Sequence, residues 1–195
     1  MDRKGEFSRK TKETSIELTI NIDGTGQYDV DTGVPFFDHM IVLFSKHGLF
    51  DLRVKAEGDI EVDYHHLVED TAIVLGGAMK KALGDLKGIK RYGFAAIPMI
   101  EAYAEVAVDI SLRPHHVFRC DVKSEKVGQF DTELVEEFVR AFAQSSGICV
   151  HVNVPYGSNT HHTVEAIFKA LGRALDMATM IDERVGGIPS TKGVL

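Results

Sequence analysis

A five-residue motif with two histidines and a glutamate occurs twice in this chain. Residues 65–69 (HHLVE) return as residues 161–165 (HHTVE), ninety-six positions later. Each copy opens a segment with helical periodicity, and side chains three or four residues apart share one side of a helix. The glutamate of each motif therefore lies beside its histidines. Imidazole nitrogens and carboxylate oxygens are the ligands that borderline divalent metal ions prefer.

The geometry of a helix limits how the paired histidines can bind metal. Two adjacent helical residues point about 100° apart, because an α-helix has 3.6 residues per turn. One pair therefore cannot easily chelate a single ion. Two pairs can serve two ions if each ion takes one histidine from each copy. The repeat thus predicts a two-metal site that draws on His65, His66, Glu69, His161, His162 and Glu165.

The composition is that of an ordinary globular protein. Of the 195 residues, 44% are hydrophobic and 26% are charged, and the net charge is −7. This balance, without a basic block, argues against a nucleic-acid partner. No apolar run is long enough to span a membrane, and the N-terminus has no hydrophobic stretch typical of a secretory signal. Cys120 and Cys149 are isolated thiols, which fits a cytoplasmic protein.

Hydrophobic periodicity predicts two similar halves. Strands are expected over residues 15–23, 27–30, 49–56, 103–110, 117–122 and 148–154, with 27–30 returning from a turn at 24–26. Helices are expected over residues 34–47, 65–83, 132–146 and 162–180. This order favours an α+β fold of two internally duplicated, two-layer half-domains, each a mainly antiparallel sheet packed on helices. The halves are placed at 1–88 and 89–195, with a linker near residues 87–92 and a loop at 186–193.

Taken together and in order, several segments resemble the imidazoleglycerol-phosphate dehydratase family, the lyases of histidine biosynthesis. The resemblance runs from about Arg9 to the C-terminus. It rests on both histidine motifs, on the opening segment 9–14 (RKTKET), which is similar to the family's first strand, and on segments 36–40 (FFDHM), 47–48 (HG), 130–136 (FDTELVE) and 189–195 (PSTKGVL).

The resemblance implies two Mn²⁺ ions per active site. One ion would take His39, His66, His161 and Glu165. The other would take His65, Glu69, His162 and one residue of the expected helix 132–146, where Glu137 stands at a position that often carries histidine. The family's ligands come from more than one subunit of a homo-oligomer of twenty-four chains. The chain departs from the family's pattern at Val42, Leu43, Tyr64 and Ile100, which bear on contacts with the substrate.

The implied reaction converts D-erythro-imidazoleglycerol phosphate to imidazoleacetol phosphate with loss of water. The proton that leaves is bound to a carbon without an adjacent carbonyl, so a simple base cannot remove it, and a metal-bound imidazolate offers a route. A carboxylate would then move protons, with Glu13 as the first candidate and the ligands Glu69 and Glu165 as the others. The resemblance also implies contacts to the substrate and its phosphate from Glu13, His39, His47, Arg91, Arg113, Lys169, Ser190, Thr191 and Lys192.

Two other functions remain open at this point. A metallohydrolase would hold a water between the ions and would act on phosphate esters without an imidazole ring. A metal-dependent assembly protein would bind Mn²⁺ and oligomerise without turnover. Of the remaining histidines, His115 and His116 lie in a strand-like segment without an acidic residue three positions on, and His151 lies in the middle of an expected strand. Because adjacent strand residues face opposite ways, we interpret the pair, and also His151, as structural.

Overall fold

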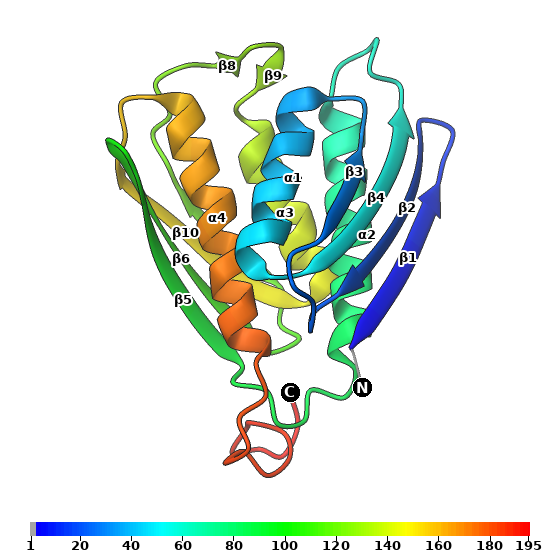
Figure 1. Cartoon of the computed structure of the whole chain (residues 1–195), viewed down its shortest axis with the longest axis vertical. Helices are drawn as coiled ribbons and strands as arrows, with labels where there is room; N and C mark the ends of the chain where they lie inside the picture. The colour runs from blue at the N-terminus through cyan, green and yellow to red at the C-terminus, as the bar shows by residue number, and fades with distance from the viewer. Residues whose placement is uncertain (1–2) are drawn as a thin grey trace.

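Four helices lie between two four-stranded sheets (Figure 1). The computed structural model describes residues 3–195. The first half contains β1 (Lys4–Lys10), β2 (Thr14–Asn21), β3 (Tyr28–Asp31), α1 (Pro35–Gly48), β4 (Asp51–Gly58) and α2 (His65–Leu83). The second contains β5 (Tyr92–Met99), β6 (Ala102–Ile110), β7 (His115–Arg119), β8 (Lys126–Val127), β9 (Phe130–Asp131), α3 (Leu134–Ser146), β10 (Ile148–Tyr156) and α4 (Thr160–Thr179). The expected α+β fold is confirmed.

The two sheets have the same topology. Their strand orders are β1-β2-β4-β3 and β5-β6-β10-β7. In each of these orders the first and third strands are antiparallel to the second, and the fourth strand runs parallel to the third. A helix links each parallel pair, α1 between β3 and β4 and α3 between β7 and β10, as a parallel crossover requires. A small hairpin, β8–β9, is added before α3 in the second half.

One hydrophobic core is shared by both halves. Alternate residues of β2, Ile16, Leu18 and Ile20, are buried, as the period of two in the sequence predicts. Helix α2 covers β1 and β2, α4 covers β5 and β6, and the helices pack across the halves as α2 on α3 and α1 on α4. Each half is thus two layers deep, and the helix layers face each other. The division at 88/89 remains our proposal for the two halves.

Backbone contacts at two glycines bring the helices of different halves together. A Cβ on Gly76 of α2 would lie 2.9 Å from the carbonyl oxygen of Phe142 in α3. A Cβ on Gly172 of α4 would lie 2.5 Å from the carbonyl oxygen of Phe44 in α1. Only a residue without a side chain permits this approach. The N-termini of all four helices lie at the same end of the molecule, at the top of Figure 1.

Several sequence-based boundaries were wrong. The segment 9–14 is not one strand: β1 ends at Lys10, and a turn separates it from β2. The strand expected at 27–30 runs back as expected, but β3 pairs with β4 rather than with β2. Strand β5 begins inside the expected linker and was missed, and β7 starts two residues earlier than expected. Residues after α4 form only an isolated bridge at Ile181, as the loop prediction indicated. None of the described helices is long and apolar enough to cross a membrane.

The close contact at Gly172 predicts a large effect of one added methyl group. Gly172→Ala should lower the free energy of unfolding by about 1–3 kcal/mol, the usual cost of overpacking a well-packed core. Gly186→Ala is the matched control, since nothing lies within 4 Å of a Cβ there. Denaturant unfolding of both variants measures the difference. Equal stability of the two variants would show that α1 and α4 are not held in contact at this glycine.

Candidate metal centre and substrate site

The first donor group lies where α1 packs against α4. His39 comes from the second turn of α1, and His161 and Glu165 come from the start of α4. The Asn159 side chain caps α4 by accepting a hydrogen bond from the backbone N–H of His162. The Nε2 atoms of His39 and His161 lie 2.8 and 3.1 Å from the same oxygen of Glu165, Oε1. Two imidazole nitrogens and a carboxylate oxygen therefore converge on one point.

Lys169 orients the glutamate of this group. Its Nζ donates to the other carboxylate oxygen, Glu165 Oε2, at 2.7 Å, one helical turn along α4. Burial raises the pKa of Glu165, but hydrogen bonds from Lys169, His39 and His161 outweigh it and lower the pKa to about 2. The carboxylate is thus ionised at neutral pH, and its free side is the one that faces the two histidines.

The second donor group lies where α2 packs against α3. His65 and Glu69 come from the first turns of α2, and Glu137 comes from the first turn of α3. The donor atoms of each group lie within 4.8 Å of one another. Helix α1 ends with Leu49 in the left-handed conformation and α3 ends with Gly147 in the same conformation. His39 precedes Leu49 by the same number of residues as Glu137 precedes Gly147. Glu137 is therefore the equivalent of His39 in the second half.

An arginine offsets part of the negative charge of the second group. Arg140 Nη2 donates to Glu69 Oε1 at 2.8 Å and also contacts Glu137 Oε1. Its Nε donates to Glu137 Oε2 at 3.0 Å. The hydrogen bond from Arg140 holds the pKa of Glu137 below its usual value. A cation that binds Glu69 and Glu137 must therefore compete with this guanidinium for the same oxygens.

His66 and His162, the other members of the two pairs, lie outside both groups. Each is bound through Nδ1 to a carboxylate on a loop: His66 to Asp59 at 3.1 Å, and His162 to Glu101 at 2.9 Å. The hydrogen bond with Asp59 raises the pKa of His66. Within the described chain Nε2 has no hydrogen-bond partner on either ring, and both side chains are partly exposed. A carboxylate on one ring nitrogen orients the other nitrogen of a metal-binding histidine.

Three of the four ligands that the sequence predicts for each ion are thus brought together within one chain. The fourth, His66 for the first group and His162 for the second, is not. The expected pairing of one histidine from each motif therefore does not occur inside a single chain. Instead, His66 lies next to the second group on α2 and His162 lies next to the first group on α4, each with a free Nε2.

Glu13 stands in the turn between β1 and β2, rather than in a strand. Its carboxylate Oε2 lies 4.0 Å from His66 Nδ1, and its backbone oxygen accepts a hydrogen bond from the N–H of Asp59. The equivalent turn of the second half carries Glu101 beside His162. In that turn Ile100 is 83% exposed and has a φ of 54°, which is uncommon for a β-branched side chain.

Five of the residues expected to bind the phosphate lie together, far from the two donor groups. A pocket of about 800 Å³ lies between the ends of β5 and β6 and the C-terminal tail, and no acidic residue lines it. It is lined in part by Arg91, Arg113, Ser190, Thr191 and Lys192. Basic and hydroxyl side chains without a carboxylate suit an anion such as phosphate.

Arg91 has a structural role as well. It is buried, and its Nε and Nη2 donate to the two oxygens of Asp109 at 2.7 and 3.2 Å. Its Nη1 donates to the backbone oxygen of Pro189 at 2.9 Å, which ties the tail to the sheet. Lys169 and His47 are not part of this pocket. His47 lies towards the end of α1, where burial and then the charge of Lys169 lower its pKa.

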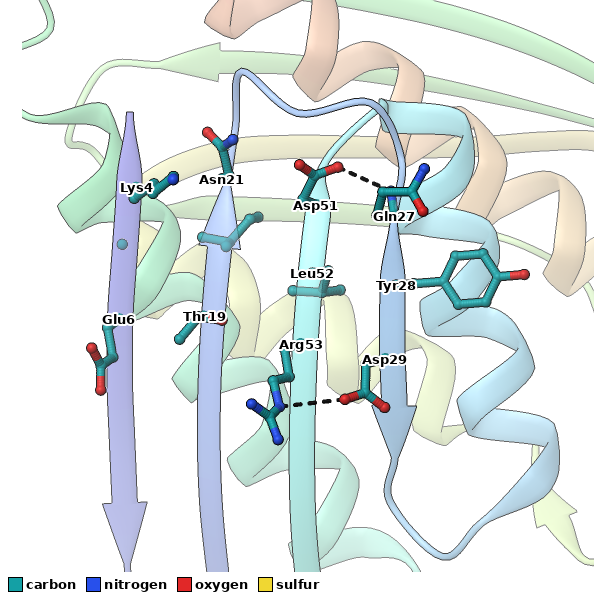
Figure 2. A pocket seen from close by; sticks show the side chains of 12 residues that line it. Lys4, Glu6, Thr19, Asn21, Gln27, Tyr28, Asp29, Asp51, Leu52 and Arg53 are labelled. Atoms are coloured by element: carbon teal, nitrogen blue, oxygen red, sulfur yellow. Dashed lines mark hydrogen bonds and ion pairs between the residues drawn. The ribbon is translucent and has the colours of Figure 1, made fainter. Parts of the chain in front are cut away.

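A second large pocket contains none of the expected site residues. It has a volume of about 640 Å³ and lies on the outer face of the first sheet, away from the helices (Figure 2). Three of its charged groups are paired: Arg53 with Asp29 at 3.3 Å, and Asp51 with the backbone N–H groups of Thr25 and Gln27. We assign it no role.

Four residues of the site were missed or assigned otherwise from the sequence. Arg140 could have been found, because it follows Glu137 by three residues on one helix face. Lys169 was expected to bind phosphate but contacts Glu165. Asp59 and Glu101 reach their histidines from loops, and nothing in the local sequence indicates this. His115 and His116 open β7, just before the start of the strand expected at 117–122, and His151 lies in β10, as expected.

The same family is found by comparison of sequences and of structures. The profile described as imidazoleglycerol-phosphate dehydratase matches residues 32–175. The imidazoleglycerol-phosphate dehydratases of Acetivibrio thermocellus and Bacillus subtilis are 61% and 59% identical, over 100% and 99% of this chain and 100% of theirs. A crystal structure of this enzyme from Staphylococcus aureus is 40% identical with a TM-score of 0.83, over 92% of this chain and 99% of that one. The Pyrococcus furiosus structure, in complex with (S)-C348, is 36% identical with a TM-score of 0.84, over 96% and 99%. With this fold and these donor groups, the chain belongs to the imidazoleglycerol-phosphate dehydratase family of hydro-lyases.

Proposed function

We propose that this protein dehydrates D-erythro-imidazoleglycerol phosphate to imidazoleacetol phosphate in L-histidine biosynthesis. The observation that carries the proposal is the pair of donor groups at equivalent places in the two halves of a chain that matches this family along its whole length. The proposed location is the cytoplasm, which suits two cysteines that form no disulfide.

The proposed cofactor is two Mn²⁺ ions per active site, and the donor sets fit it. Each group combines imidazole nitrogen with carboxylate oxygen, and the second has two carboxylates, which suits an ion harder than Zn²⁺. The first ion would be held by His39, His161 and Glu165, and the second by His65, Glu69 and Glu137. When bound, the ions would supply Lewis-acid polarisation of the substrate's imidazole ring.

The remaining residues would position the substrate and move protons. The C-terminal pocket with Arg113 and Lys192 would bind the phosphate, while Arg91 fixes the tail that carries Ser190 and Thr191. Glu13 is the proposed proton-transfer group, because it is half-exposed and its carboxylate is not held by an arginine or a lysine among the described residues. By contrast, Glu69 is bound to Arg140 and Glu165 to Lys169.

We propose that each active site is shared between subunits of a homo-oligomer, which the family suggests has twenty-four chains. The Arg91 N–H binds the carbonyl oxygen of Ala178 near the end of α4, whereas Glu165 lies thirteen residues earlier. A helix rises about 1.5 Å per residue, so the phosphate pocket and the metal group of one chain are separated by about 20 Å. A small substrate cannot reach both in one chain. His66 and His162, each with a free Nε2, are the proposed ligands for a neighbour's ions.

The outer face of the second sheet supports oligomerisation. Tyr92, Phe94 and Tyr156 are 59%, 52% and 61% exposed there. The equivalent face of the first sheet carries Tyr28 beside charged residues, including Glu6 and Arg53 (Figure 2). The second sheet also carries charges on this face, since Asp109 lies opposite Tyr92, but exposed aromatic side chains are typical of a contact between proteins.

The metal proposal predicts a reversible loss of activity. Removal of metal by a chelator should abolish dehydration of imidazoleglycerol phosphate, and Mn²⁺ should restore it. The measurement is product formation together with elemental analysis of the protein. Full activity in metal-free protein would refute the metal mechanism. Hydrolysis of phosphate esters that lack an imidazole ring would instead indicate a metallohydrolase, and Mn²⁺ binding without turnover would indicate an assembly protein.

Substitutions in the two groups should separate the two ions. Glu137→Ala should lower the metal affinity of the α2–α3 group, and His39→Ala should lower that of the α1–α4 group. Loss of a residue that only orients a metal ligand typically costs 10–100-fold in affinity, so loss of a ligand itself should cost about 10²-fold or more. Each variant should retain about one ion per chain where wild type holds two, by metal titration of the chelated protein. A Glu137→Ala variant that binds both ions like wild type would remove Glu137 from the ligands.

Sharing between subunits predicts complementation of two inactive variants. A His162→Ala subunit still has a complete α2–α3 group but cannot supply His162 to a neighbour. A His65→Ala subunit has a damaged group but can supply His162. Co-expressed in equal amounts, they should form about one complete site in four by random mixing within a symmetric particle. Activity per chain relative to wild type measures this fraction.

A matched pair serves as the control. His65→Ala and Glu69→Ala damage the same group, whose residues lie in one chain, so mixing these variants should restore nothing. If His162→Ala with His65→Ala also restored nothing in verified mixed particles, the site would be confined to one chain.

A further inference from the structure

An ionic cluster around the buried carboxylate of Asp70 is present in the first half of the protein and absent from the second, and its arginine, Arg9, has a side chain that is 42% exposed. Arg9 Nε donates to Asp70 Oδ1 at 2.8 Å, and Thr14 Oγ1 donates to Asp70 Oδ2 at 2.5 Å. Asp70 and Thr14 are 6% and 4% exposed. Asp70 follows the metal-group residue Glu69 on α2, and Thr14 ends the turn that carries Glu13.

The internal repeat identifies the residues that replace this cluster in the second half. A Cβ on Gly5 would meet Ala78 and Ala82 of α2, and a Cβ on Gly93 would meet Ala174 and Ala178 of α4. Strand and helix therefore pack in the same register in both halves. Equivalent residues differ in number by 88 in the strands and by 96 in the helices. In this register Arg9, Thr14 and Asp70 correspond to Ile97, Ala102 and Ala166.

The comparison indicates that the fold does not need the cluster. The second half builds the same strand pair on the same helix with three apolar residues, and Ala102 and Ala166 are 1% and 0% exposed. A partly exposed ion pair contributes little to stability, and the burial of Asp70 costs desolvation energy, so apolar replacements are often neutral or stabilising. A function in the first half is a better reason for the cluster than stability.

The contacts around the cluster lead to Glu13. Thr11 Oγ1 accepts hydrogen bonds from the N–H groups of Glu13 and Thr14, each at 3.0 Å, which fixes the turn. The Glu13 carbonyl oxygen accepts from the N–H of Asp59 at 3.1 Å. Asp59 in turn holds His66. The bond from Thr14 to Asp70 ties this turn directly to α2, in addition to the indirect link through Asp59 and His66.

We propose that Arg9, Thr14 and Asp70 are positioning residues that hold the turn of Glu13 against the start of α2, so that its carboxylate faces the substrate beside His66. The inference rests on the proposed dehydratase function, in which Glu13 moves a proton. The second half needs no such device, because Glu101 of its turn is held directly by His162 and by the N–H of Asn159.

The test copies the second half into the first. The triple variant Arg9→Ile, Thr14→Ala, Asp70→Ala should assemble and unfold like wild type and should bind the same amount of Mn²⁺. Its kcat should fall by about 10–100-fold, because a catalytic group displaced by about 1 Å can lose this much rate. KM should stay within about twofold, since the residues proposed to bind the phosphate are unchanged. Thr14→Ser keeps the hydroxyl and should retain most of the wild-type kcat, whereas Thr14→Val should not.

Hydrogen exchange gives a readout that does not depend on activity. Amides of residues 11–14 and of Asp59 should exchange faster in the triple variant, while amides in the middle of α2 should be unchanged. Wild-type kcat and exchange in the triple variant would overturn the proposal, as would a variant that fails to fold or loses metal, since the cluster would then support the fold itself. A wild-type protein without dehydratase activity would refute the proposed function, while the exchange data would still decide whether the cluster holds the turn.

Discussion

The distance between helix backbones is the constraint on which the donor groups depend. Each group takes residues from two helices of different halves, and their side chains can meet only if the helix axes stay close over the first turns. Gly76 and Gly172 allow this, because a carbonyl of the neighbouring helix occupies the space of a side chain. The same close packing leaves the helix ends in register, so His39 and Glu137 reach equivalent places. The packing of the helices and the geometry of the donor groups are therefore set by the same contacts.

The helices and the paired histidines could be predicted because their signals are local. Apolar residues recur at helical spacing in α2 and α4, and the histidine motifs open both helices. Strand β5 could not be predicted in the same way: Tyr92, Phe94 and Pro98 face outwards while its inward residues are also apolar, so alternation is lost. Pro98 is tolerated because β5 is an edge strand. The pairing of β3 with β4 depends on a crossover that a turn signal does not reveal.

The site was predictable to the extent that it lies on single helices. His65 with Glu69, and His161 with Glu165, follow from a spacing of four residues. Which helix supplies the third residue depends on tertiary packing, and only the family resemblance pointed to His39 and to the helix of Glu137. The loop carboxylates Asp59 and Glu101 depend on chain reversals far from their histidines in sequence. No local pattern encodes such contacts.

Arg140 offsets part of the charge of the second donor group. Its guanidinium binds both Glu69 and Glu137, so the two carboxylates do not face each other without a cation between them. We expect the polypeptide to complete its fold without a bound ion. If the group holds a metal ion as proposed, loading exchanges one cation for another, and the displacement of Arg140 lowers the affinity of every ion that enters. The site would then discriminate by displacement as well as by ligand type, since only an ion that outcompetes an internal guanidinium could enter.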